Sequence, residues 1–122
     1  NGPAQAAYTK ALQSDHSHIK PTVEKLRERR DYAYKRLNEI EGLSAAKPEG
    51  AFYIFPKIEN NTFKDDKEWV LELLKQKQVL TVFGSGFGEE YGKGHFRIVY
   101  LPEMKVLEEA FNKIEEFMQG EI

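Results

Sequence analysis

Apolar residues recur at helical spacing in four stretches of the chain. The pattern predicts a short alanine-rich helix over 4–12 and a long helix over about 20–40. A third helix is expected to begin at Asp65 and Asp66, and a fourth to follow Pro102. The apolar stripes of the last three helices are expected to be buried, and consist of Ile19, Val23, Leu26, Ala33, Leu37, Ile40, Trp69, Val70, Leu73, Leu74, Met104, Leu107, Ala110, Phe111, Ile114, Phe117 and Met118.

Strand-forming residues occupy three further runs, over 50–56, 79–82 and 94–100. The elements therefore follow one another in the order α-α-β-α-β-β-α. Helices can cover only one face of so small a sheet. We expect an α+β fold, a small α/β sandwich whose short antiparallel or mixed sheet is covered by helices on one face.

Composition narrows the class of protein. A length of 122 residues predicts a single domain, and a net charge of −2 from charges of mixed sign offers no broad basic face for nucleic acid. The absence of cysteine excludes disulfides and thiolate chemistry, and no run is apolar enough to span a membrane. We expect a soluble, cytoplasmic protein, and the Lys- and Glu-rich, Cys-free composition favours a thermophile. His16 and His18 are expected to be loop residues, so no metal site is predicted.

Arg97 is the main candidate for binding chemistry, because it stands alone at the centre of the apolar run 94–100. A guanidinium in such a run needs an anion, and its planar fork fits a carboxylate at two points. Three interpretations remain open: a surface arginine, which is the commonest case, a salt bridge to a glutamate, or a ligand carboxylate. Alternation along the strand gives the two faces His95, Arg97 and Val99, and Phe96, Ile98 and Tyr100.

A glycine loop, Gly84-Ser85-Gly86-Phe87-Gly88, precedes this strand. It lacks the Gly-Lys-Ser/Thr ending of a phosphate-binding loop, and no helical pattern opens directly after it. We therefore interpret it as a turn that needs positive φ and close backbone approach, with a flexible loop near a ligand as the second interpretation.

Aromatic residues gather in the run 50–56, which invites comparison with an RNA-recognition strand. The match is poor, because Glu49 stands where that signature has a basic residue. Core packing is the preferred explanation for Phe52, Tyr53 and Phe55. An RNA-binding module that uses these three side chains is nevertheless kept as the alternative function.

Four motifs along the chain, taken together, resemble one known family: the class I, fold-type I aminotransferases that use pyridoxal phosphate. The resemblance spans the whole chain and corresponds to the C-terminal third of such an enzyme. The motifs are Asn1-Gly2-Pro3-Ala4-Gln5-Ala6-Ala7, Glu28-Arg29-Arg30-Asp31, Lys47-Pro48-Glu49-Gly50-Ala51-Phe52-Tyr53, and Val82-Phe83-Gly84-Ser85-Gly86-Phe87-Gly88 followed by Gly94-His95-Phe96-Arg97-Ile98.

The resemblance implies the small C-terminal domain of an aminotransferase, with residues 1–18 as helix and linker from the large-domain side and 19–122 as the small-domain core. By position, Arg97 is similar to the arginine that holds the substrate α-carboxylate in a two-point salt bridge, and the domain is expected to move as a lid. Phe83 departs from the family, which usually has proline there. This leaves Arg97 unaffected but changes the expected rigidity of the loop.

The resemblance also implies that the rest of the active site lies upstream of Asn1. The full-length enzyme is expected to use pyridoxal phosphate, an amino acid and a 2-oxo acid, and to form a homodimer. We expect this piece to carry no catalytic, cofactor-binding or metal-binding residue, to bind no cofactor and to be inactive alone. A lyase, a synthase or a regulator of the same family is the further alternative.

Overall fold

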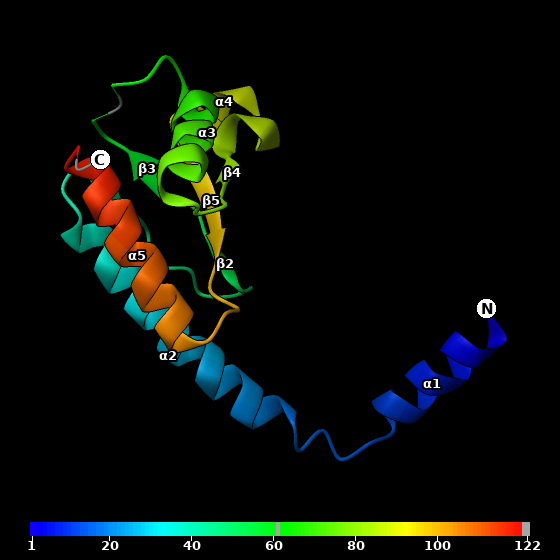
Figure 1. Cartoon of the computed structure of the whole chain (residues 1–122). Helices are drawn as coiled ribbons and strands as arrows, with labels where there is room; N and C mark the ends of the chain where they lie inside the picture. The colour runs from blue at the N-terminus through cyan, green and yellow to red at the C-terminus, as the bar shows by residue number, and fades with distance from the viewer. Residues whose placement is uncertain (61, 121–122) are drawn as a thin grey trace.

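Short strands and longer helices alternate along the chain in the computed structural model, which describes residues 1–60 and 62–120 (Figure 1). Residues 61, 121 and 122 of the expected small-domain core therefore lie outside the described residues. The elements are α1 (Gly2–Leu12), α2 (Ile19–Glu39), β1 (Leu43–Ser44), β2 (Tyr53–Ile54), β3 (Lys57–Ile58), α3 (Asp66–Lys77), β4 (Val82–Phe83), the 3-10 helix η1 (Gly84–Phe87), α4 (Glu89–Gly92), β5 (Phe96–Val99) and α5 (Met104–Met118).

The strands form two small antiparallel sheets. The larger sheet has the order β2-β5-β4, so that β5 is its central strand. Tyr53 pairs with Val99 on one side of β5, and Val82 pairs with Arg97 on the other. The second sheet joins β1 to β3. The predicted α+β class is confirmed.

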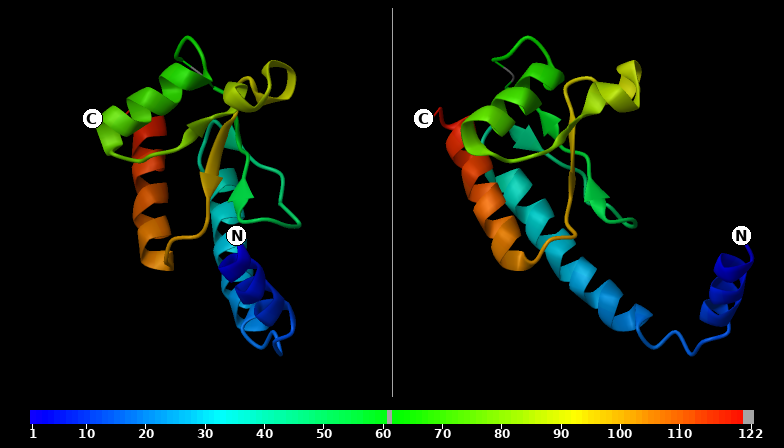
Figure 2. Two further views of the ribbon diagram at one scale, coloured as in Figure 1. Left: turned by 90° about the vertical axis from the view of Figure 1, so that its right-hand side faces the viewer. Right: turned by 45° about the vertical axis from the view of Figure 1, so that its right-hand side comes forward.

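Helices α2, α3 and α5 cover one face of the larger sheet and leave the other face open (Figures 1 and 2). Side chains on the covered face are buried, as at Ile54, Phe96 and Tyr100. Their neighbours along the same strands, Tyr53 and Val99, are exposed. The alternation predicted for 94–100 is therefore confirmed, and Arg97 lies on the open face.

Aromatic side chains dominate the core between the sheet and the helices. The Trp69 ring lies 4.5 Å from that of Phe96 and 5.5 Å from that of Phe117, centroid to centroid. Such contacts join α3, β5 and α5 through one apolar cluster. The buried hydrophobic residues are Ala33, Leu37, Ile40, Leu43, Ile54, Ile58, Trp69, Val70, Leu73, Phe96, Tyr100, Leu107, Phe111, Ile114 and Phe117.

Two ends of the predicted apolar stripes are not buried. Ile19 and Val23 are exposed at the start of α2, which extends past the body of the molecule (Figure 1). Leu74 is exposed near the end of α3. Helix α1 has no buried residue at all and lies apart from the other elements, although Asn1 caps it through a hydrogen bond to Ala4 N. The core therefore starts in the second half of α2.

The sequence-based assignment differs from the structure in the strands and at the glycine loop. The run 50–56 pairs only at β2, and the predicted strand 79–82 is found only as β4 (Val82–Phe83), which shares one residue with it. The strands β1 and β3 are additional. Helical turns do follow Phe83, as η1 and α4, against the expectation of no helix there. The prediction of core packing is also wrong for two of the three aromatic residues in 50–56, because Phe52 is 45% exposed and Tyr53 is 42% exposed.

No helix among residues 1–60 and 62–120 combines the length and the apolar character that a membrane span requires.

Candidate functional site

Arg97 lies at the centre of the open face, on the middle strand of the larger sheet. Its guanidinium carbon is 4.2 Å from the centre of the Phe87 ring and 5.4 Å from that of Tyr53. A guanidinium placed against aromatic faces is attracted by the ring quadrupole and loses rotational freedom. The two rings therefore hold the planar fork of Arg97 in a limited set of orientations.

Within residues 1–60 and 62–120, Arg97 has no charged partner. Among the described residues, no carboxylate forms an ion pair with it, and its buried Nε has no hydrogen-bond partner. An intramolecular salt bridge, one of the three interpretations, is therefore wrong for this part of the chain. A buried donor without a partner costs about 1–3 kcal/mol, which an incoming anion recovers by accepting from it.

The Phe87 ring packs against a row of further rings, those of Phe55 and His95. The Phe87 ring meets the Phe55 ring edge-on with centroids 6.0 Å apart. Phe55 in turn stacks on His95 at 5.3 Å and an interplanar angle of 9°. His95 is half-buried, and its Nδ1 lies 3.0 Å from the Lys93 carbonyl oxygen. His95 is thus a packing residue of the site.

The glycine loop owes its composition to close backbone approach, as predicted. A Cβ on Gly84 would overlap the carbonyl oxygen of Gly92, and a Cβ on Gly92 would overlap that of Gly84. Gly84 N also donates to the His95 carbonyl oxygen at 2.8 Å. Positive φ is found at Gly88 and Gly94, at 143° and 73°. The interpretation as a glycine-dependent turn is confirmed.

The Arg29-Arg30-Asp31 segment connects α2 to the chain after β5 and to the segment before β2, which meet at the same end of the larger sheet. Arg29 Nη1 donates to the Leu101 carbonyl oxygen just after β5. Arg30 contacts Asp31 Oδ1 at 2.7 Å, and Lys47 contacts the same oxygen at 2.9 Å. The Lys47 hydrogen bond, followed by that of Arg30, lowers the pKa of Asp31. The role of this segment is structural, since each of these groups has a partner within the protein.

The polar residues of the N-terminal linker form no comparable site. His16 and His18 are exposed, with ring centroids 6.5 Å apart. Within residues 1–60 and 62–120 no group of three or more histidine, aspartate or glutamate side chains is placed to hold a metal ion.

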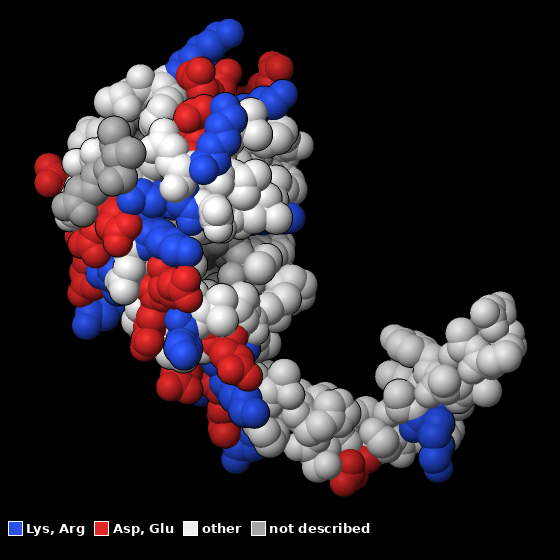
Figure 3. Space-filling view, in the orientation of Figure 1, with Lys and Arg blue, Asp and Glu red and all other residues white. Residues whose placement is uncertain are grey.

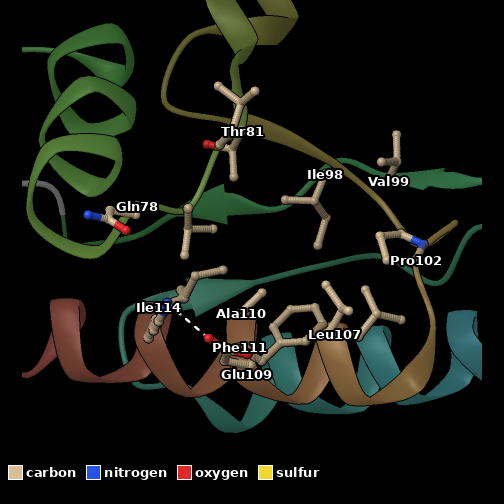
Figure 4. A pocket seen from close by; sticks show the side chains of 14 residues that line it. Gln78, Thr81, Ile98, Val99, Pro102, Leu107, Glu109, Ala110, Phe111 and Ile114 are labelled. Atoms are coloured by element: carbon tan, nitrogen blue, oxygen red, sulfur yellow. Dashed lines mark ion pairs between the residues drawn. The ribbon is translucent and has the colours of Figure 1, made fainter.

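A groove of about 310 Å³ lies between α5 and the strand segments that face it (Figure 4). Its lining is mainly apolar, with Ile98 and Leu107 on its two sides. Its one ion pair joins Glu109 to Lys113 at 3.1 Å and is neutral overall. The groove therefore has no free positive charge that could bind a small anionic ligand, whereas Arg97 provides one.

The aromatic residues of the open face are engaged within the protein. Tyr53 lies under Arg97, and Phe55 stacks on His95. Phe52 meets Tyr53 edge-on at 5.9 Å. Figure 3 shows Lys and Arg interspersed with Asp and Glu over the helices on the visible side. RNA binding needs free ring faces beside a basic surface, so these observations do not favour the alternative function.

Comparison with known proteins gives a consistent result. The sequence profile of class I and II aminotransferases matches residues 1–114. The chain is similar to an alanine aminotransferase from Pyrococcus furiosus, with 56% identity and a TM-score of 0.95, over 98% of this chain and 30% of that one. It is also 42% identical to the glutamate-pyruvate aminotransferase AlaA of Haemophilus influenzae, over 97% of this chain and 30% of the relative. An aromatic-amino-acid aminotransferase from Thermococcus litoralis is 40% identical over 94% of this chain and 29% of its own length. The chain thus spans about 30% of the length of these relatives.

Proposed function

The chain belongs to the class I and II aminotransferases, and from that membership we propose that it supplies the substrate-carboxylate site of an enzyme that transfers an amino group between an amino acid and a 2-oxo acid. The observation that carries this proposal is Arg97, whose guanidinium lies between two rings on an open sheet face and whose buried Nε has no partner among the described residues. Both substrates of such a reaction carry a carboxylate next to the reacting carbon, so one fixed fork can bind either.

Arg97 would act by orientation. Two parallel N–H···O bonds to a carboxylate fix the position of the substrate and its rotation about the carboxylate axis. Phe87 and Tyr53 limit the rotation of the guanidinium itself. The substrate's reacting carbon is then presented in one orientation to the rest of the active site.

Pyridoxal phosphate is the cofactor of this family, and the described residues do not fit it. A lysine that forms a Schiff base must be desolvated and deprotonated. The lysines here are exposed except Lys77 and Lys113, which are paired with Glu116 and Glu109 at 2.9 and 3.1 Å. We therefore propose that the cofactor is held by parts of the enzyme outside these 122 residues, and that this piece alone binds no cofactor and is inactive.

We also propose that residues 19–122 form a mobile small domain that closes over the substrate and excludes water, with 1–18 belonging to the large-domain side. The exposed open face and the unburied α1 support this division, since both present apolar side chains that a second domain could cover. The relatives' names make alanine, glutamate and pyruvate the first substrates to test. The homodimer, the cytoplasmic location and the thermophilic origin stay predictions.

The proposal is tested with Arg97→Lys in the full-length protein. Lysine keeps the charge but loses the fork, so we expect kcat/KM for amino transfer to fall by about 100-fold or more. Arg27, an exposed arginine on α2, provides the matched control, and Arg27→Lys should leave kcat/KM unchanged.

A near-normal kcat/KM for Arg97→Lys would overturn the assignment. Product analysis distinguishes the alternatives within the family. A lyase or synthase would form other products from the amino acid while keeping its dependence on Arg97, and a regulator would turn over no substrate.

A further inference from the structure

Asp66 is a buried carboxylate at the first position of α3, and the proposed function of Arg97 does not account for it. Only 2% of its surface is exposed. Burying a carboxylate is costly unless hydrogen bonds replace its water. The hydrogen bond that Asp66 makes reaches outside its own helix: Asp66 Oδ2 accepts from the backbone N–H of Ser85, in the glycine loop, at 2.7 Å.

We propose that Asp66 is a positioning residue for Arg97, which holds the glycine loop so that the Phe87 ring lies against the guanidinium. The inference rests on the proposed function of Arg97 as the carboxylate-binding residue. It adds a second residue, far from the substrate, on which substrate binding depends.

The contact fixes the start of η1. A hydrogen bond from a backbone N–H to an ionised carboxylate is about twice as strong as a neutral one. The N-terminal end of α3 further favours the negative charge at this place. Together with the bond from Gly84 N to the His95 carbonyl oxygen, it ties two successive residues of the loop to α3 and to the segment that leads into β5.

Phe87 takes its position from the loop, and the Asp66 contact attaches this loop to the N-terminal end of α3. Phe87 ends the four-residue η1 that Gly84 begins, and 52% of its surface is exposed. Its ring meets that of Phe55 and the Arg97 guanidinium, and Phe87 is not among the residues of the hydrophobic core. Without the Asp66 contact, the loop backbone could shift and take the Phe87 ring away from Arg97.

The consequence for binding follows from the geometry of the guanidinium. A two-point contact with a carboxylate requires the fork to lie in one plane with the ligand. A tilted fork keeps its charge and loses one of its two hydrogen bonds. The remaining hydrogen bond and the charge still orient the carboxylate, so the bound substrate and the transition state lose the same interaction, and KM should rise while kcat changes little.

The test compares two neighbouring carboxylates of the full-length protein. Asp65 caps α3 by accepting from Glu68 N at 2.8 Å and does not contact the loop. Asp66→Ala should raise KM for the amino acid and the 2-oxo acid about tenfold, with kcat within about threefold of the parent. Asp65→Ala should lower the melting temperature through the lost cap and leave KM unchanged.

The same substitutions are repeated in an Arg97→Ala background. If Asp66 acts through Arg97, Asp66→Ala should change KM less than about twofold there. An unchanged KM in the parent background, or an undiminished effect without Arg97, would overturn the inference. If Arg97→Ala itself leaves KM unchanged, the proposed function fails, and the two failures are distinguishable.

Asp66→Asn is the second test variant, to be used if the Asp66→Ala variant does not fold. It keeps the shape and an oxygen acceptor but gives up the charge, so KM should rise about threefold, and only when Arg97 is present. A KM equal to that of the parent in a folded Asp66→Asn variant would overturn the inference.

Discussion

Arg97 shows how the surroundings of one residue decide between interpretations that its type leaves open. Charge and strand position allowed a surface arginine, an ion-paired arginine or a ligand-binding one. The Nε, buried and without a partner among the described residues, and the two flanking rings argue against an internal salt bridge, and the proposal of a ligand-binding arginine rests on them. The sequence could not supply these facts, because Phe87 reaches Arg97 through a loop and Tyr53 reaches it from another strand.

Period-two alternation was nevertheless a usable signal at the residue scale. It placed Arg97 opposite the buried Phe96, and the same rule applied to β2 would have paired Tyr53 with Phe55 on the open face. Asp66 had no such signal. Its charge at a helix start indicates a favourable dipole contact, whereas its partner Ser85 is 19 residues away in the sequence.

At the scale of elements, the helices were predictable and the strands only partly so. Each of α2, α3 and α5 has enough turns for its periodicity to emerge, and α5 matches its predicted buried face. The strands β1 and β3 have two residues each, too few for a pattern. Their pairing depends on tertiary contacts such as the hydrogen bond from Glu59 N to the Gly42 carbonyl oxygen at 2.8 Å.

The connection between α2 and the segment before β2 makes stability depend on pH. Asp31 is paired with Lys47 and Arg30, and both lower its pKa. Its folded pKa lies below the unfolded value of about 3.9, so the stabilisation is present above that value and is lost as the pH falls through the folded pKa. Asp31→Asn should lower the free energy of unfolding by less than about 1 kcal/mol at pH 7, since the pair is half-exposed.

This difference should shrink as the pH falls below the unfolded value of about 3.9, because the unfolded chain then binds a proton at Asp31 more readily than the folded chain. Thermal unfolding followed by circular dichroism from pH 3 to 7 measures it, with Glu24→Gln on the same helix as the control. A penalty for Asp31→Asn that is equal at pH 3 and pH 7 would show that the ion pairs contribute nothing.

The whole molecule consists of a packed body and one detached helix. Helix α1 has no buried residue, and residues 13–18 connect it to α2 (Figure 2). The alanine-rich pattern predicted the helix correctly, because local propensity and the Asn1 cap are sufficient for it. The position of α1 relative to the body could not be predicted, because α1 has no apolar stripe that would indicate a packing partner.

Limited proteolysis of the 122-residue chain tests this division. We expect a protease of broad specificity to cut first within 13–18, because that segment is exposed and contributes nothing to the core. The remaining body should melt at the same temperature as the intact chain. Resistance of 13–18 to cleavage, or a lower melting temperature after it, would show that α1 packs on the body.

The contact between Gly84 and Gly92 makes these two positions depend on each other in mutation. Alanine at either one must push the two backbones apart, and the space so opened relieves this overlap for a Cβ on the other, although a Cβ on Gly84 would still meet the His95 carbonyl oxygen at 2.6 Å. The double variant should therefore lose less free energy of unfolding than the two single losses added together, and a double-mutant cycle measures the difference. A lineage that had accepted one such change could accept the second with little further loss, so the order of the two substitutions would govern which sequences descendants can reach.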